Sequence, residues 1–538
     1  MNYNYNYNYN EFKGDTNECT SRGACSISPT IAALQELILY YLCHLAYYLL
    51  KLEKIGASNP KINENIINDI ASLVTINEFS EKQLFSILNR DYLLVQNAKE
   101  TYCAICAQNG LQPKLLRDIA GFKENTTVSK AISLGEKLFL SQYNKYTQVQ
   151  KNNISILQIL IKSVSIHLIK LSEFFKLEDE AYHLILESLY ILRPGKVFLT
   201  RIKQKINELA KTDNILQLKI ANTMLKEFVQ ISKVNVSHSS RKGKAILVSG
   251  NNFSDLLKIL EQTKDLNIDV YTHSNLLIAH AFAKFNSYPN LRAHYGDTTE
   301  NCILDFSTFP GAILLTKNSR NNTEYLYRGR LFSNDYFVPH GVVKIENNDY
   351  SPLIDSALNA KGFSKGKEKP DTTMGFDPKD ISKIFNDICA KLKKEEISRL
   401  FIIGMNPYSE VQKEYFNNLF SQLQEDEIAI NFSTQICDNK NVININVGNF
   451  NPLAVYLLEK FFQKVDIKNE NIYFFFSNCD VITISNIIFL RGLNTKNIYL
   501  AQCTPTLINP SVFATFKKEY KINVTSSPRK DLLQIRKK

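Results

Sequence analysis

The chain has 538 residues, of which 44% are hydrophobic and 22% charged, a balance typical of a globular protein with several domains. Its net charge of +11 is dispersed, and the short basic runs at 391–394 and 536–538 are better explained by a solvated helix face and a chain end. The composition therefore argues against a nucleic-acid partner, and the 10 scattered cysteines argue against a disulfide framework.

The first half of the chain predicts helices after a short polar start. Residues 1–18 open with an Asn/Tyr alternation that cannot build a core, so we expect a low-complexity, disordered tail. From about residue 31 to residue 234, apolar residues recur with helical spacing throughout, and Pro and Gly are rare. The pattern predicts a helical-bundle domain over residues 19–238.

The most apolar segment of this domain, residues 31–50, is long enough to cross a membrane. Its early Glu36, its His44 and the amphipathic helices that follow favour a buried bundle helix instead. The basic, apolar and small-residue order of a secretory signal is not found in the sequence. We therefore expect a cytoplasmic protein without a membrane partner.

The character of the sequence changes at the polar linker 239–243. AILVSG, FSDLLKILEQTKDL and IDVYTH follow it and predict a buried strand, a helix and a second strand. After a Gly/Lys/Pro-rich stretch, LFIIGM, IAINFST, NIYFFFS and NIYLAQ predict further strands that alternate with helices. The sequence thus predicts a multidomain α plus α/β protein, with two Rossmann-like, doubly wound α/β domains over 239–370 and 371–538 after the helical domain.

Ligands of open α/β sheets collect beyond the carboxyl ends of the strands, so the candidate site is expected in those loops. The sequence contains neither a P-loop nor a GxGxxG motif. The loops that follow the predicted strands are 250–252, 273–275, 318–319, 404–406, 435–437 and 478–480.

The stretch 245–320 resembles the cluster-binding core of the hybrid cluster protein (prismane, hydroxylamine reductase) family. LVSG, LEQT, VYTH and FPGAIL occur in the family's order and spacing, and the resemblance covers nearly the whole chain from Cys19 onward. The resemblance implies the architecture predicted above. It also implies a reductase in which electrons pass through iron–sulfur clusters to hydroxylamine or nitric oxide, with an electron-donor protein as partner.

Most positions at which the resemblance places ligands of the mixed iron–sulfur–oxygen cluster carry other residues in this chain. The family's SGH turn ends in Asn251, and Asn275 occupies the position of a glutamate in THGEMLPAH. Ser319 stands where the family has a cysteine after FPGAIL, and Met405 replaces the cysteine of GCDG. Neutral amide, hydroxyl and thioether groups are much weaker iron ligands than thiolate, imidazole or carboxylate.

A few residues remain that could bind metal. By the same resemblance, Cys437 is retained in the GCAKYR loop, and Asp480 stands in place of the last glutamate. Cys19 and Cys25 are left from the four-cysteine N-terminal cluster, and two thiolates cannot complete that cluster alone. A cluster shared between two subunits is an alternative, and the sequence does not give the oligomeric state.

A CxxC motif, Cys103 to Cys106, lies outside the strand-end loops. CxxC is often half of a redox or zinc site, but no second pair stands at metal spacing. On a helix we expect the two cysteines to be semi-buried apolar residues.

Four family positions other than the ligands carry polar or charged side chains. We expect His273 and His280 to cap and pack a strand-to-helix corner, although proton supply to the site is the alternative. We expect His167 to be a packed core histidine, and Arg330, close to Tyr327, to pair with a buried carboxylate.

We therefore expect a divergent family member in which the iron–sulfur clusters are incomplete or absent and the reductase activity is reduced or lost. A metal-free scaffold with an interaction or regulatory role is the alternative function. A third possibility is an altered metal site that recruits Cys479, Cys503 or Met405 beside Cys437.

Overall fold

The computed structural model describes residues 29–57, 65–70, 73, 80–143, 145–174, 178–193, 195, 198–296, 302–317, 325–335, 338, 341–404, 410–477, 480–501 and 510–537. The expected tail, 1–18, lies outside these residues. The chain forms two compact units, of which the first comprises Met1–Leu216, Asp480–Phe489 and Thr504–Tyr520. The second comprises Gln217–Cys479, Leu490–Cys503 and Lys521–Lys538. The domain limits at 238 and 370 stay predictions.

The first unit is helical, as predicted. Its helices are α2 (Pro29–Glu53), α4 (Glu81–Gln108), α5 (Val128–Tyr143), α6 (Gln148–Ser172), α7 (Asp179–Leu192), most of α8 (Leu199–Glu227), most of α16 (Val481–Gly492) and α17 (Pro510–Glu519). Capping boxes begin two of them, because Ser80 and Gln83 exchange bonds at the start of α4, and Thr147 and Gln150 do so at α6.

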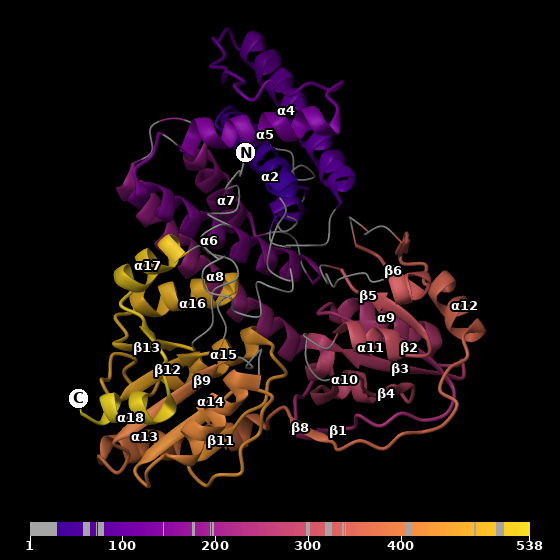
Figure 1. The fold of residues 1–538 in the computed structure, drawn as a ribbon, viewed down its shortest axis with the longest axis vertical. Coiled ribbons are helices and arrows are strands. Elements are labelled where there is room, and N and C mark those ends of the chain that lie inside the picture. The colour runs from indigo at the N-terminus through magenta and orange to yellow at the C-terminus, as the bar shows by residue number, and fades with distance from the viewer. Residues whose placement is uncertain are drawn as a thin grey trace. The chain divides into compact units, whose positions relative to one another are not determined.

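Helix α2 is the central helix of this unit and packs against α4, α5 and α7 (Figure 1). Both α2 and α6 are long and apolar enough to cross a membrane by length and composition. In each helix, however, 78% of the apolar window is buried inside the structure, as expected for core helices of a globular protein. The prediction of a buried bundle helix at residues 31–50 is thus confirmed.

The expectation of helices throughout 31–234 is wrong for residues 111–119, which carry no helical structure. Helix α4 stops in a Schellman motif, in which the Leu111 N–H donates to the Cys106 carbonyl at 2.8 Å. Gly110 supplies the positive φ of +65° that this motif requires. Pro113 then cannot donate a helical hydrogen bond, so the helix does not resume directly after Gly110.

The second unit contains the two predicted parallel sheets. The first has the order β4-β3-β2-β5-β6-β7, with β2 (Lys244–Ser249), β3 (Ile268–His273), β4 (Leu291–His294), β5 (Ala312–Leu315), β6 (Leu331–Ser333) and β7 (Val343–Lys344). The second has the order β11-β10-β9-β12-β13-β14, with β9 (Arg399–Gly404), β10 (Glu427–Asn431), β11 (Val442–Asn444), β12 (Ile472–Phe476), β13 (Asn497–Leu500) and β14 (Asn523–Val524). Both orders are those of a doubly wound Rossmann-like sheet, which confirms the predicted fold class.

The helices of the second unit lie between or after these strands, and most of them form the long connection that a parallel crossover needs. They are α9 (Phe253–Thr263), η2 (Ser274–Ala281), α10 (Ala283–Asn286), α11 (Cys302–Thr308), η4 (Tyr325–Arg330), α12 (Ser351–Asn359), α13 (Pro378–Lys393), α14 (Glu410–Ser421), α15 (Asn451–Phe462) and α18 (Pro528–Arg536). A separate antiparallel pair, β1 (Val234–Val236) with β8 (Thr372–Met374), joins the two ends of the first α/β segment.

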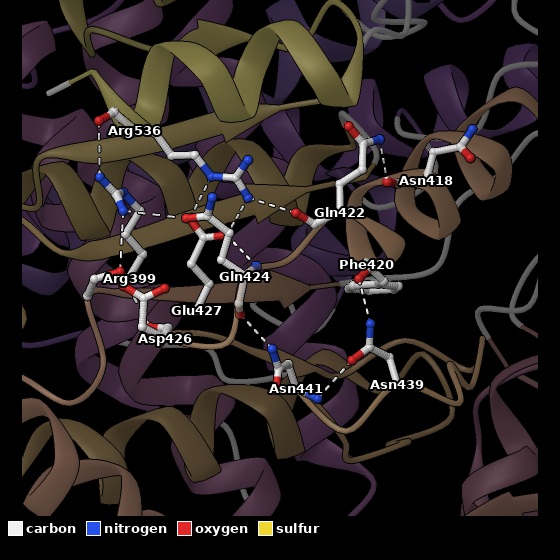
Figure 2. Close-up of polar contacts among 11 residues, drawn as sticks. Arg399, Asn418, Phe420, Gln422, Gln424, Asp426, Glu427, Asn439, Asn441 and Arg536 are labelled. Atoms are coloured by element: carbon white, nitrogen blue, oxygen red, sulfur yellow. Dashed lines mark hydrogen bonds and ion pairs between the residues drawn. The ribbon is translucent and has the colours of Figure 1, made fainter.

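At the amino edge of the second sheet, a buried carboxylate holds the C-terminal helix in place. Glu427 is fully buried and receives both Nε (2.9 Å) and Nη2 (2.6 Å) of Arg536 from α18. Arg399 Nη1 lies 3.6 Å from the same carboxylate, and the Gln424 N–H donates to it at 3.0 Å. Figure 2 shows these groups converging on Glu427. This edge of the second sheet therefore has a structural role.

Candidate functional site at the switch point of the first sheet

The order of the first sheet reverses between β2 and β5, and the carboxyl ends of these strands form the crevice where such sheets bind ligands. Thr316 follows β5 and lies across this crevice. Its hydroxyl oxygen accepts the N–H groups of Asn251 (3.2 Å) and Asn252 (3.3 Å), and its own N–H donates to the Ser249 carbonyl at 3.0 Å. The loop after β2 is therefore fastened to the end of β5.

The start of α9 strengthens this fastening. Asn252 caps the helix by accepting the Asp255 N–H at 2.9 Å. The buried Asp255 carboxylate in turn accepts the Lys317 N–H at 3.1 Å, the Tyr350 hydroxyl at 3.0 Å and the Asn334 amide at 2.7 Å. The acidic side chain in the first turn of α9 thus ties that helix to the segments that follow β5 and β6.

His273, the last residue of β3, bridges two neighbouring segments at the same edge. Its Nδ1 lies 2.8 Å from the Ser249 hydroxyl and its Nε2 lies 3.3 Å from the Asp305 carboxylate. Gly296, with a φ of +87°, leaves room for this pair, because a Cβ there would lie 2.4 Å from the Asp305 carboxylate. Ser249 and His273 are both buried, so this chain of polar groups is internal rather than open to solvent.

Two further imidazoles, those of His280 and His294, lie within hydrogen-bonding distance of one hydroxyl group, that of Thr272. Thr272 Oγ1 lies 2.8 Å from His280 Nε2 and 2.9 Å from His294 Nδ1. Burial, with a smaller contribution from the neighbouring His238, lowers the pKa of His280 to about 3. Burial and the surrounding histidines also hold the pKa of His294 well below its ordinary value. These groups stay neutral in the folded chain and pack the corner between β3 and η2.

The structure brings the first two substituted ligand positions to one edge of the sheet. Asn251 lies two residues beyond the end of β2, and Asn275 lies two residues beyond the end of the neighbouring β3. Both side chains are half-buried. The convergence expected from the resemblance is therefore present for this pair, but the groups that converge are amides.

The retained Cys437 has the environment of a core thiol. Its side chain is half-buried against the hydrophobic core of the second sheet. Its backbone N–H donates to the Asn444 side chain at 3.2 Å, and its carbonyl accepts from the same side chain at 2.8 Å. Burial, and then the charge of Asp438, raises the pKa of the Cys437 thiol.

Asp480 has a structural bond of its own. Its Oδ1 accepts the Thr483 N–H at 2.7 Å, which is the geometry of an N-cap at the start of α16. The other predicted positions, Cys19, Cys25, Ser319, Met405, Cys479 and Cys503, lie outside the described residues.

The candidate donor groups among the described residues do not by themselves fit an iron–sulfur cluster. Among the residues that the structure describes, no group of three or more His, Cys, Asp or Glu side chains is placed to hold a metal ion. Asn251 and Asn275 are neutral, Cys437 favours its protonated form, and Asp480 caps a helix. Such a set supplies neither the charge nor the soft ligands that iron–sulfur clusters require.

Two secondary predictions about isolated side chains are confirmed. Cys103 is half-buried, Cys106 is buried, and both are free thiols. His167 is a packed core histidine, 3% exposed, with its Nδ1 2.6 Å from the buried Asp213 carboxylate.

Two other secondary predictions need correction. Arg330 does not pair with a buried carboxylate: its guanidinium donates to the carbonyl oxygens of Phe306, Phe309 and Gly311, the last two flanking Pro310 before β5. His273 and His280 do pack the corner as predicted, but His273 makes no side-chain cap to η2. The imidazole is already engaged by Ser249 and Asp305.

The sequence reasoning missed Asp305, Thr272 and His294, which complete the polar network of this edge. His294 ends the short strand β4, which lies directly beside β3 in the sheet. LRAH is too short and too polar to stand out as a strand by alternation alone.

Comparison with known proteins gives a consistent picture over the whole chain. A family model described as Prismane/CO dehydrogenase family matches residues 13–441. Hydroxylamine reductase of Rhodospirillum rubrum is 26% identical over 538 residues, covering 96% of this chain and 96% of that protein. Hydroxylamine reductase of Methanocella arvoryzae is 24% identical over 545 residues, covering 96% and 97%.

Among solved structures, a similar one describes NiZn[Fe4S4] and NiNi[Fe4S4] clusters in closed and open alpha subunits of acetyl-CoA synthase/carbon monoxide dehydrogenase. It shares 9% sequence identity with a TM-score of 0.48, and the match covers 97% of this chain and 84% of that chain.

Proposed function

The chain belongs to the Prismane/CO dehydrogenase family, and from this membership we propose that it is a divergent hydroxylamine reductase homologue whose iron–sulfur chemistry is reduced or lost. It retains the Rossmann-like sheets and the switch-point loops of the fold. A metal-free scaffold with an interaction or regulatory role is the alternative function.

The observation that carries this proposal is the pair Asn251 and Asn275 at the carboxyl ends of β2 and β3. The resemblance assigns an imidazole and a carboxylate to these positions: the imidazole is a strong nitrogen ligand for iron, and the carboxylate would balance part of its charge. Amides cannot become anionic, and their oxygens are weak ligands for iron. The loss of two ligands at neighbouring strand ends therefore weakens the whole site.

The environment of the retained residues supports the same proposal. The Cys437 thiol, whose pKa is raised by burial and by Asp438, packs against the hydrophobic core of the second sheet. One oxygen of the Asp480 carboxylate accepts the Thr483 N–H at the start of α16. Cys437 and Asp480 thus have structural roles that do not depend on a cluster.

A parallel activity measurement tests the proposal. The chain and the Rhodospirillum rubrum hydroxylamine reductase are produced and purified anaerobically in the same way, and hydroxylamine consumption is followed with a chemical reductant in excess. Because changes even in residues that only support metal ligands cost ~10- to 100-fold, we expect a rate at least roughly a hundredfold lower for this chain. Equal rates per protein would contradict the proposal.

A further inference from the structure

At the amino end of β2, two chain segments lie side by side and are joined through their backbones. The Ser240 N–H donates to the Lys367 carbonyl at 2.9 Å, and the Lys367 N–H donates to the Ser240 carbonyl at 3.0 Å. Gly243 and Phe363 exchange a second pair of hydrogen bonds, at 3.1 and 2.8 Å, and both bridges are antiparallel. Residues 239–244 and 361–369 therefore form one ribbon, which we call the basic ribbon.

Close packing and side-chain bonds fix the conformation of the basic ribbon. At Gly362, φ is +69° and a Cβ would lie 2.2 Å from the Gly243 carbonyl oxygen, so only glycine fits there. The Ser239 hydroxyl accepts the Lys369 N–H at 3.0 Å and donates to the Lys369 carbonyl at 3.2 Å. The side chains of the ribbon are thus carried on a defined backbone.

The basic ribbon and the crevice described above lie at opposite ends of β2. Lys244 is the first residue of this strand, whereas Ser249, beside the crevice, is the last. A partner of the basic ribbon therefore contacts a surface that is separate from the candidate site.

Positive charge dominates the basic ribbon. Its sequence contains one acidic residue, Glu368, and Asp371 follows its end. Its basic residues are Arg241, Lys242, Lys244, Lys361, Lys365, Lys367 and Lys369. The excess of cations over anions is therefore concentrated in two short segments that lie against each other.

Some of these cations already have a partner within the chain. Asp269 accepts two hydrogen bonds from the Arg241 guanidinium, at 2.8 and 2.5 Å. The Lys244 ammonium donates to the Ala360 carbonyl at 2.6 Å. Four lysines are exposed and form no ion pair with any described residue: Lys242, Lys361, Lys365 and Lys367.

A second basic run, at the end of α13, shows how lysines are compensated within this chain. Lys391 lies 2.9 Å from Asp387, and Lys394 lies 3.9 Å from Glu396. The four lysines of the basic ribbon have no such partners among the described residues, and like charges held on a fixed backbone repel one another. An anionic partner relieves this repulsion.

The chemistry of the basic ribbon fits carboxylates better than a nucleic acid or a membrane. Its guanidinium, the group that reads base edges, is held by Asp269. Its one aromatic ring, Phe363, is packed among three others, so it is not a platform on which bases stack; these are Tyr271, Tyr295 and Phe309. Phe363 is also its one large apolar residue, so the ribbon has no exposed side chain that inserts into a bilayer.

We propose that the basic ribbon docks a partner protein through a patch of aspartate and glutamate side chains on that partner. The carboxylates of the patch pair with the four uncompensated lysines. Because such pairs stay partly solvated, they speed the encounter and select the partner more than they add affinity. The complex is therefore transient and sensitive to salt.

The inference goes beyond the proposed loss of iron chemistry and fails or holds independently of it, since neither the probe nor the readout involves iron. The probe is a fluorescent peptide of about ten glutamates, whose charge is complementary to the ribbon. It is added to the full chain and followed by fluorescence anisotropy. We expect saturable binding that weakens as salt is raised, and binding of a lysine peptide of the same length that is at least about tenfold weaker.

Two triple variants locate the binding on the basic ribbon. K242E/K365E/K367E should weaken binding of the glutamate peptide at least about tenfold. The matched control K130E/K137E/K145E reverses three exposed lysines of the helical unit that also form no ion pair with any described residue. It changes the net charge equally and should weaken binding less than about threefold, because distant exposed charges are screened.

Three results would overturn the proposal. The first is a lack of saturable binding by the glutamate peptide at millimolar concentration and low salt. The second is an equal loss of binding in both triple variants, which would reduce the effect to overall charge. The third is binding of a single-stranded oligonucleotide of equal charge, or of phosphatidylserine vesicles, that is at least about tenfold tighter and is lost in K242E/K365E/K367E. That result would assign the ribbon to a nucleic acid or to a membrane.

Discussion

The imidazoles at the carboxyl edge of the first sheet are held neutral by burial and by hydroxyl groups, and this has a consequence for stability. His280, 8% exposed, lies 2.8 Å from the Thr272 hydroxyl, and burial lowers its pKa to about 3. An unfolded histidine titrates at pH ~6.5, so below that pH the unfolded chain binds a proton at His280 that the folded chain does not bind. The contribution of His280 to stability is present above that pH and is lost as the pH falls from about 6.5 toward about 3.

The variant H280Q tests this effect, because a glutamine amide can keep the bond to Thr272 without titrating. Between pH 5 and pH 4, we expect the free energy of unfolding of H280Q to fall less steeply than that of the wild type, by ~1.4 kcal/mol per pH unit. Urea unfolding at a series of pH values measures the two slopes. Equal slopes would show that the His280 imidazole becomes charged in the folded state.

Gly296 is the second residue of this edge whose identity the geometry fixes. A Cβ there would lie 2.4 Å from the Asp305 carboxylate and 2.8 Å from the His273 ring, at a backbone φ of +87°. We expect G296A to lower the free energy of unfolding by about 2 kcal/mol, through backbone strain and displacement of Asp305. G329A is the matched control, since a Cβ at Gly329 would meet nothing within 4 Å. Chemical denaturation of both variants gives the comparison, and equal stabilities would contradict the crowding argument.

The residues of the site could be located from the sequence only where they end a long, apolar strand. Asn251 and Asn275 follow the buried strands β2 and β3, so their convergence could be predicted. Asp305 lies on the short helix α11 and His294 on a four-residue strand, neither of which has a distinctive period. Their meeting at His273 and Thr272 depends on tertiary packing, which a single sequence does not give.

Among the elements, the irregular segment 111–119, which we call the strap, is held by hydrogen bonds to tyrosine side chains. Tyr40 holds it twice, through Asp118 at 3.1 Å and through the Ile119 N–H at 2.9 Å. We expect Y40F to lower the free energy of unfolding by about 1–3 kcal/mol, because Phe cannot hold either group. The Ile119 amide should also exchange faster with solvent deuterium.

Y92F is the matched control for this prediction. Tyr92 lies on α4 and contacts Tyr41 and Phe122 through its ring, while its hydroxyl makes no hydrogen bond to any described residue. Hydrogen exchange of the strap should therefore be unchanged in Y92F. Equal acceleration in both variants would mean that ring packing, not hydroxyl bonding, holds the strap.

The helices and strands with strong periodicity could be predicted from the sequence, and the strap could not. IAINFST and NIYFFFS gave β10 and β12, because buried parallel strands are nearly continuous apolar runs. The segment after Gly110 instead has the composition of the helices around it, apart from Pro113. Its conformation is set by tyrosines from two other helices, a long-range effect that local patterns do not record.

For the whole molecule, the buried carboxylate of Glu427 links the second sheet to the end of the chain. Arg536 donates two hydrogen bonds to it, at 2.9 and 2.6 Å, and Arg399 lies beside them. We expect E427Q to lower the free energy of unfolding by about 3–5 kcal/mol, since it leaves two guanidinium groups without their anion. E425Q is the control, because the pair of Glu425 with Lys440 is 93% and 76% exposed. If urea denaturation gave an equally small change in the free energy of unfolding for both variants, Glu427 would not hold the C-terminal helix in place.

The central claim is that the family fold persists while its iron–sulfur chemistry is reduced or lost. The most direct measurement is the iron and acid-labile sulfide content of the full chain, purified anaerobically from cells supplied with iron. We expect a colourless protein with well below one iron atom per chain. A brown protein with several iron and sulfide atoms per chain would contradict it, because Asn251 and Asn275 would then stand in a working metal site.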